Sequence, residues 1–66
     1  MRHVVVRRTG FLPYFLCAPW SDGTDRWDCH VDQAHVFGAA AARRIADQLN
    51  AKNPCAVIPA TVEVLR

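Results

Sequence analysis

The sequence predicts a small α+β fold, in which an antiparallel-type β-sheet carries one α-helix on one face in the approximate order βββαβ. Three observations predict this class: a valine-rich run at residues 2–8, helical periodicity at residues 39–51, and apolar–polar alternation at residues 55–66. Sixty-six residues without a repeat or a linker form one compact domain, residues 1–66. Because 52% of the residues are apolar and only 21% are charged, the chain can bury a core, and disorder is not expected.

The N-terminal residues predict a β-hairpin. Residues 2–8 are rich in β-branched side chains, and the run of three valines favours a central strand. The pair Thr9-Gly10 predicts a tight turn, because Gly tolerates positive φ. Residues 11–18 are then the second strand, and we expect it at the edge of the sheet because Pro13 has no N–H to donate.

The middle of the chain is predicted to be a loop followed by a helix. Residues 19–33 contain Pro, Gly, Ser and Asp without a lasting period, which indicates a loop with a short strand around Trp27. Residues 34–38 fit either a short strand or the first turn of a helix. The helix of residues 39–51 is the clearest element, and Asn53-Pro54 ends it. Its apolar stripe comprises Ala42, Ile45, Ala46 and Leu49, and its polar face comprises Arg43, Arg44, Asp47 and Gln48.

Residues 55–66 predict a last strand with one apolar face. That face comprises Ile58, Ala60, Val62 and Val64, while Val57, Thr61 and Glu63 take the other. Pro59 indicates an edge or a bulge. Exposed edges at strands containing Pro13 and Pro59 are compatible with a monomer and with a homodimer.

The order of these elements resembles that of small phage-encoded accessory proteins, anti-CRISPR proteins among them. The resemblance lies in size and in a hydrophobic skeleton that covers most of the chain, namely Trp20 or Trp27, Ala34, Phe37, Ala40 to Ala42, Ile45-Ala46, Leu49 and Val62 to Leu65. It implies a non-catalytic inhibitor of a host protein or nucleoprotein complex, such as a CRISPR effector. It carries no site residues over to this chain.

The three cysteines favour a reducing cytoplasm. Cys17, Cys29 and Cys55 are far apart and odd in number, so they cannot all pair within the chain. We expect small buried thiols, with one disulfide plus a free thiol as the alternative. The basic and then apolar N-terminus has the outline of a signal peptide, but Pro13 and Pro19 interrupt its apolar run. The run is also far shorter than the ~20 residues that span a membrane, so no membrane association is expected.

Neither a metal site nor catalysis is predicted from the spacing of candidate residues. Cys29 and His30 are adjacent and would point to opposite sides of an extended backbone, and no pair has C-x-x-C spacing. A zinc site would need a folded constellation of Cys17, Cys29 and His35. A nucleophile, Cys29 or Cys17, would be activated by His35 with Asp32 orienting the His35 ring, and it would need a cleft for which the chain leaves little room. We therefore expect a non-enzyme without metal or cofactor.

Charge is concentrated in residues 20–32, which hold four of the six carboxylates and both tryptophans. Only Arg26 opposes these aspartates, so the segment has a net charge of −3. A row of acids can occupy a groove built for phosphates, and indoles anchor interfaces. The predicted partner-binding residues are Trp20, Asp22, Asp25, Asp28 and Asp32, with Trp27 assigned to the core. The other reading of the segment is a polar loop whose aspartates bond the nearby backbone.

The rest of the chain is basic and predicts an alternative function. Seven basic residues against Asp47 and Glu63 give it a net charge of +5. A direct nucleic-acid-binding module would use Arg7, Arg8, Arg43 and Arg44 along a phosphate backbone. The sequence thus favours an inhibitor that blocks the nucleic-acid site of a host complex, with direct nucleic-acid binding as the alternative.

Overall fold

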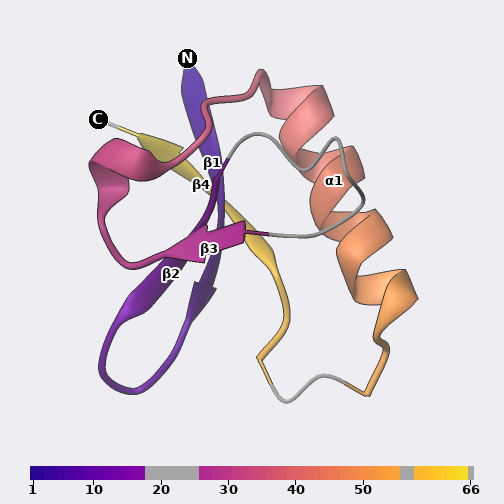
Figure 1. Ribbon diagram of the computed structural model, residues 1–66. Helices are drawn as coiled ribbons and strands as arrows, with labels where there is room; N and C mark the ends of the chain where they lie inside the picture. Colours follow the sequence, from indigo (N-terminus) through magenta and orange to yellow (C-terminus); the bar gives the residue numbers. More distant parts are fainter. Residues whose placement is uncertain (18–25, 56–57, 66) are drawn as a thin grey trace.

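The computed structural model describes residues 1–17, 26–55 and 58–65, which form a four-stranded sheet with one helix on it (Figure 1). The strands are β1 (Arg2–Arg8), β2 (Pro13–Cys17), β3 (Arg26–Asp28) and β4 (Thr61–Leu65). A short 3₁₀ turn, η1 (Val31–Gln33), and the helix α1 (Ala39–Lys52) lie between β3 and β4. Every neighbouring pair of strands is antiparallel in the order β3-β2-β1-β4, so the predicted α+β class is confirmed.

Strand β1 lies inside the sheet, as its valine run predicted. Val4, Val5 and Val6 are all buried, and they alternate between two apolar clusters on the two faces of the sheet. Val5 and Leu16 of β2 pack under α1. Val4 and Val6 pack on the other face with Phe15 and with the partly buried Ala34. Both faces of β1 are therefore covered, which explains why consecutive residues are apolar.

The prediction that Pro13 places its strand at the edge is wrong, because β2 lies between β1 and β3. Pro13 is the first residue of β2 and pairs only with Arg8, whereas β3 pairs with Phe15 to Cys17. No ladder hydrogen bond from β3 reaches Pro13, so its missing N–H costs nothing there. The strand is also shorter than predicted, since residues 9–12 form the turn.

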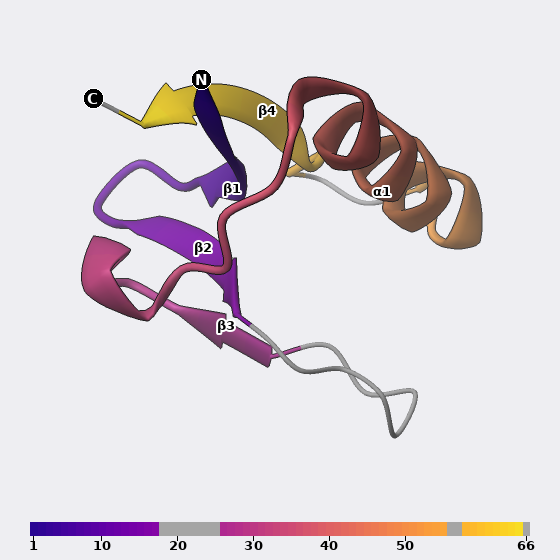
Figure 2. The same cartoon turned by 90° about the horizontal axis from the view of Figure 1, so that it is seen from above.

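Helix α1 forms as its periodicity predicted and covers β1 and β4 on one face of the sheet (Figure 2). Ala42, Ala46 and Leu49 are buried against the sheet, and Ile45 packs beside them. The side chain of Asn50 joins the helix to the start of β4: its Nδ2 donates to Ala60 O and its Oδ1 accepts from Ala60 N, both at 2.9 Å. The helix ends at Lys52, and the N–H of the next residue, Asn53, caps it by donating to Leu49 O.

Residues 34–38 are neither a regular strand nor a helical turn. Ala34 packs on the face opposite α1, and the chain then passes to the helix side (Figure 2). On the way, His35 N donates to Leu16 O at 3.0 Å. Phe37 forms an isolated bridge with His3, with N–H donated in both directions at 2.8 and 3.0 Å. These bonds satisfy backbone groups where β1 and β2 are no longer paired with each other.

Candidate functional site

The structure describes two of the five residues predicted to bind a partner. Asp28 is half-buried at the end of β3, and Asp32 is exposed in η1. Trp20, Asp22 and Asp25 lie outside the described residues. The described part of the acidic segment thus occupies one of the two edge strands of the sheet and the turn that follows it.

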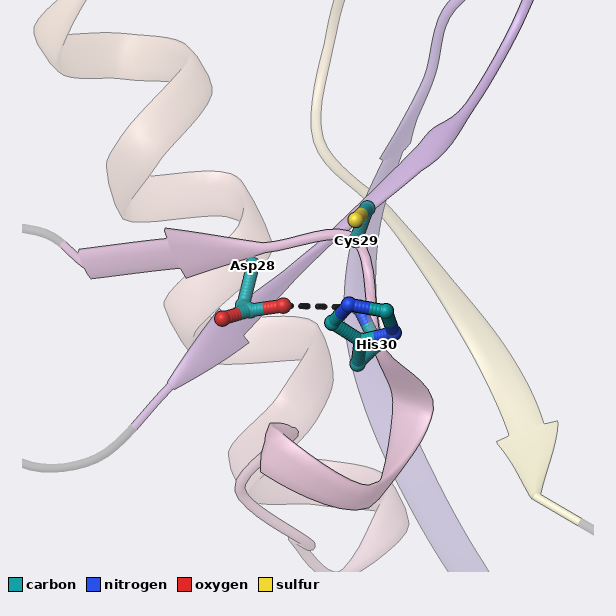
Figure 3. Close-up of side chains that lie close together, drawn as sticks. All are labelled: Asp28, Cys29 and His30. Carbon is teal, nitrogen blue, oxygen red and sulfur yellow. Dashed lines mark hydrogen bonds between the residues drawn. The ribbon is translucent and has the colours of Figure 1, made fainter.

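The chain bends immediately after β3 and brings three different donor groups together (Figure 3). Asp28 Oδ1 accepts a hydrogen bond from His30 N at 2.8 Å, which is the local turn that an Asp side chain forms with the backbone two residues on. The carboxylate, the Cys29 thiol and the His30 ring have ligand atoms within 4.8 Å of one another. The prediction that Cys29 and His30 point to opposite sides is wrong, because strand alternation ends at Asp28.

The predicted constellation of Cys17, Cys29 and His35 is not the group that the described residues form. His35 is exposed, and its ring packs edge-on against Phe37 with centroids 4.6 Å apart. Cys29 instead lies with its chain neighbours, and the donor cluster in the described ranges includes neither Cys17 nor His35. The signal for this cluster was in the sequence, since an Asp often turns the chain after it.

The three thiols are free, and the prediction that they would be buried is wrong for all of them. Cys55 is exposed, and Cys17 and Cys29 are half-buried. The Cys17 thiol donates to Phe15 O at 3.5 Å on the face opposite α1. Burial raises the pKa of Cys17, and the nearby negative charge of Asp28 raises it further.

Trp27 belongs to the core, as predicted. It is half-buried in β3 and packs against the cluster under α1. The Arg7 guanidinium lies 4.6 Å from the centre of its ring, within the range of a cation–π interaction. Arg7 Nε is buried and has no hydrogen-bond partner in the part of the chain that the structure describes, so the ring face is the contact that compensates its burial.

The four arginines of the alternative function do not form one surface. Arg7 and Arg8 are consecutive in β1 and therefore point to opposite faces of the sheet. Arg8 makes a two-pronged ion pair with Glu63 of β4, at 2.5 Å from Nε and 2.6 Å from Nη2. These hydrogen bonds lower the pKa of Glu63 against the opposing effect of burial. Arg43 and Arg44 lie elsewhere, exposed along a shallow depression on the outer side of α1.

Sequence reasoning also missed an exposed apolar tip on the β1–β2 hairpin. Phe11 is 98% exposed, and Leu12 beside it is 47% exposed. Thr9 Oγ1 accepts from the backbone N–H groups of both residues, at 3.2 and 2.9 Å, and its hydroxyl donates to Leu12 O. An ordered turn therefore holds Phe11 in solvent, whereas the prediction placed it in a strand.

Comparison of the chain with protein-family models, with curated proteins and with solved structures gives no match. Across residues 1–17, 26–55 and 58–65, no helix has the length and apolarity needed to cross a membrane.

Proposed function

We propose that this protein is a non-catalytic interaction protein whose acidic segment, residues 20–32, occupies the nucleic-acid site of a partner. The partner class is a host nucleic-acid-handling protein or nucleoprotein complex, and the inhibitor would be of the phage-encoded, anti-CRISPR type that the sequence resembles. The observation that carries the proposal is the position of β3. In the order β3-β2-β1-β4 it is one of the two edge strands, so the described end of the acidic segment lies at the periphery of the fold.

Two further features support an interface at this edge. Asp32 is exposed in η1, where its carboxylate can meet the cationic groups that line a phosphate-binding groove. Trp27 is packed against the core and stacked on Arg7, so it fastens β3 to the body of the domain. A rigid support loses little conformational entropy when the segment meets its partner. Trp20 is then the indole left to act as an anchor.

The alternative, direct nucleic-acid binding, retains only part of its predicted residues as one surface. Arg8 is paired with Glu63, and Arg7 stacks on Trp27 on the other face of the sheet. Arg43 and Arg44 are exposed together on α1, but Asp47 lines the same depression. Two arginines beside one carboxylate neutralise few phosphates, so the geometry favours the acidic segment.

The test is affinity capture of the tagged protein from bacterial lysate that contains CRISPR effector complexes, with and without nuclease, followed by mass spectrometry. The informative variant carries Asp22→Asn, Asp25→Asn and Asp32→Asn, and keeps Asp28 because it forms the turn after β3. The control is Asp47→Asn, which removes an exposed carboxylate on α1. Far-UV circular dichroism checks that each variant is folded.

We expect stoichiometric recovery of an effector that survives nuclease, is lost in the triple variant and is retained in the Asp47→Asn control. Added DNA should compete with the protein for that effector. Recovery that is the same for the triple variant and the wild type would contradict the proposal. Recovery of nucleic acid that disappears in Arg43→Ala/Arg44→Ala would favour the alternative.

A further inference from the structure

The donor cluster after β3 combines three chemically different ligands on consecutive residues. Asp28 offers a carboxylate oxygen, Cys29 a thiol and His30 an imidazole nitrogen, and their ligand atoms lie within 4.8 Å of one another (Figure 3). Zinc bonds to such ligands are about 2.0–2.3 Å long, which separates the ligand atoms of a tetrahedral ion by roughly 3.5 Å. Small side-chain rotations therefore suffice to bring the three groups onto one ion.

These donors are not engaged elsewhere in the part of the chain that the structure describes. Asp28 uses Oδ1 to accept from His30 N, so its second oxygen remains available. The Cys29 thiol and the His30 ring have no hydrogen bond or ion pair with another described residue. His30 is exposed while Asp28 and Cys29 are half-buried, so an ion can enter from solvent on the His30 side.

We propose that Asp28, Cys29 and His30 bind one divalent transition-metal cation of the Zn²⁺ type, with the fourth position open to water or to a ligand. The thiolate and imidazole select such a cation over Mg²⁺ and Ca²⁺, which prefer all-oxygen sites. Cys17 is not a ligand, because its thiol is turned to Phe15 O. The site is independent of the proposed inhibitor function, since it needs no partner.

The experiment is a titration of the reduced, metal-free full chain with Co²⁺, followed by absorption spectroscopy. A cobalt–thiolate bond gives a charge-transfer band in the near ultraviolet, and a four-coordinate ion gives intense visible bands. We expect both to saturate at one equivalent and to disappear when Zn²⁺ displaces Co²⁺. Single Cys→Ser variants then identify the sulfur ligand among the three free thiols.

The charge-transfer band should disappear in Cys29→Ser and persist in the matched controls Cys17→Ser and Cys55→Ser. His30→Ala should weaken Co²⁺ binding by more than about tenfold, since loss of even an outer partner of a metal ligand has that effect. Asp28→Asn keeps an oxygen for His30 N but removes the charge, and should also weaken binding. Circular dichroism of the metal-free variants shows whether a loss of binding follows from unfolding.

Absence of a charge-transfer band in the folded wild-type chain at millimolar Co²⁺ would overturn the proposal. So would a band that survives in folded Cys29→Ser or is lost in folded Cys17→Ser or Cys55→Ser. Because the readout is the metal itself, failure here leaves the capture experiment unaffected, and failure of capture leaves the titration unaffected.

Discussion

At the scale of single residues, the ion pair between Arg8 and Glu63 makes stability depend on pH. Hydrogen bonds from Arg8 hold the pKa of Glu63 below its ordinary value of about 4.3. A carboxyl whose pKa is lower in the folded state stabilises the fold above the unfolded pKa, and that contribution is lost as pH falls through the folded pKa. Glu63→Gln should therefore lower the urea midpoint at pH 7, and the difference from the wild type should vanish in acid. Asp47→Asn replaces an exposed carboxylate on α1 that has no ion pair among the described residues, and it should lower the midpoint at pH 7 by less than Glu63→Gln does; equal effects of the two variants would contradict this prediction.

The three thiols should differ in their rates of alkylation. Cys55 is exposed, whereas burial and the charge of Asp28 raise the pKa of Cys17 and reduce its thiolate fraction. Iodoacetamide at pH 7.5, with the modified residues identified by mass spectrometry, should label Cys55 first and Cys17 last. Asp28→Asn should speed the labelling of Cys17 because it removes a charge that disfavours the thiolate. Labelling of Cys17 before Cys55 in the wild type would contradict the prediction.

At the scale of elements, the side chain of Asn50 joins α1 to the beginning of β4. It pairs with both backbone groups of Ala60, which is buried. Asn50→Ala leaves this N–H and C=O without their partner, and an unpaired buried polar group costs about 1–3 kcal/mol. We expect a loss of roughly 2 kcal/mol in the free energy of unfolding, measured by urea denaturation. Gln48→Ala, on the exposed side of the same helix, should change it by less than about 0.5 kcal/mol. Alanine favours the helix at both positions, so similar losses in both variants would contradict the assignment of the effect to the Ala60 contact.

Local patterns predicted the elements whose residues pack by a simple period. The 3.6-residue period of Ala42, Ala46 and Leu49 correctly predicted the buried face of α1. The consecutive valines correctly predicted that β1 lies inside the sheet. The prediction that Pro13 puts its strand at the edge failed because a proline excludes a neighbouring strand only where that strand needs its N–H. Strand β3 pairs with only part of β2, and that part does not include Pro13. The bonds of Asn50 to Ala60 could not be predicted, since they depend on where the chain returns after the helix.

In the candidate site, too, local features could be predicted from the sequence and contacts between distant residues could not. Trp27 could be assigned to the core because a small domain has few other large apolar side chains to bury. The separation of Arg7 from Arg8 follows from strand alternation alone and was available from the sequence. The partner of Arg8 was not, because Glu63 lies at the other end of the chain and meets it only through strand pairing. The convergence of Asp28 and His30, by contrast, follows from the turn that an Asp side chain forms with the backbone two residues on, a signal that was present in the sequence.

At the scale of the whole molecule, the sheet separates two small apolar clusters, and strands β1 and β2 contribute side chains to both. Val5 and Leu16 belong to the cluster under α1, while Val6 and Phe15 belong to the cluster on the other face. Alternate residues of the same two strands thus serve both clusters, so neither can be lost while the strands stay paired. The backbone bridge between His3 and Phe37, which fixes the passage of the chain from one face to the other, adds to this coupling.

This arrangement predicts a single cooperative unfolding transition. Phe15→Ala removes a buried ring from the face opposite α1, at a cost of about 3–5 kcal/mol. A domain of this length has a free energy of unfolding of only about 3–10 kcal/mol, so Phe15→Ala can unfold the protein. Phe15→Leu is therefore measured as a second, less destabilising variant. In a Trp20→Phe background, tryptophan fluorescence reports Trp27 on the helix side, and its urea midpoint and that from circular dichroism should fall together.

The matched control for this prediction is Phe11→Ala, which truncates the same kind of side chain in the same hairpin. Phe11 is 98% exposed, so its removal should change the free energy of unfolding by less than about 0.5 kcal/mol. A midpoint that shifts in circular dichroism but not in fluorescence would show that the two faces unfold separately. Coincident shifts in Phe15→Leu, with none in Phe11→Ala, would mean that the strands shared by the two clusters carry the cooperativity of the fold.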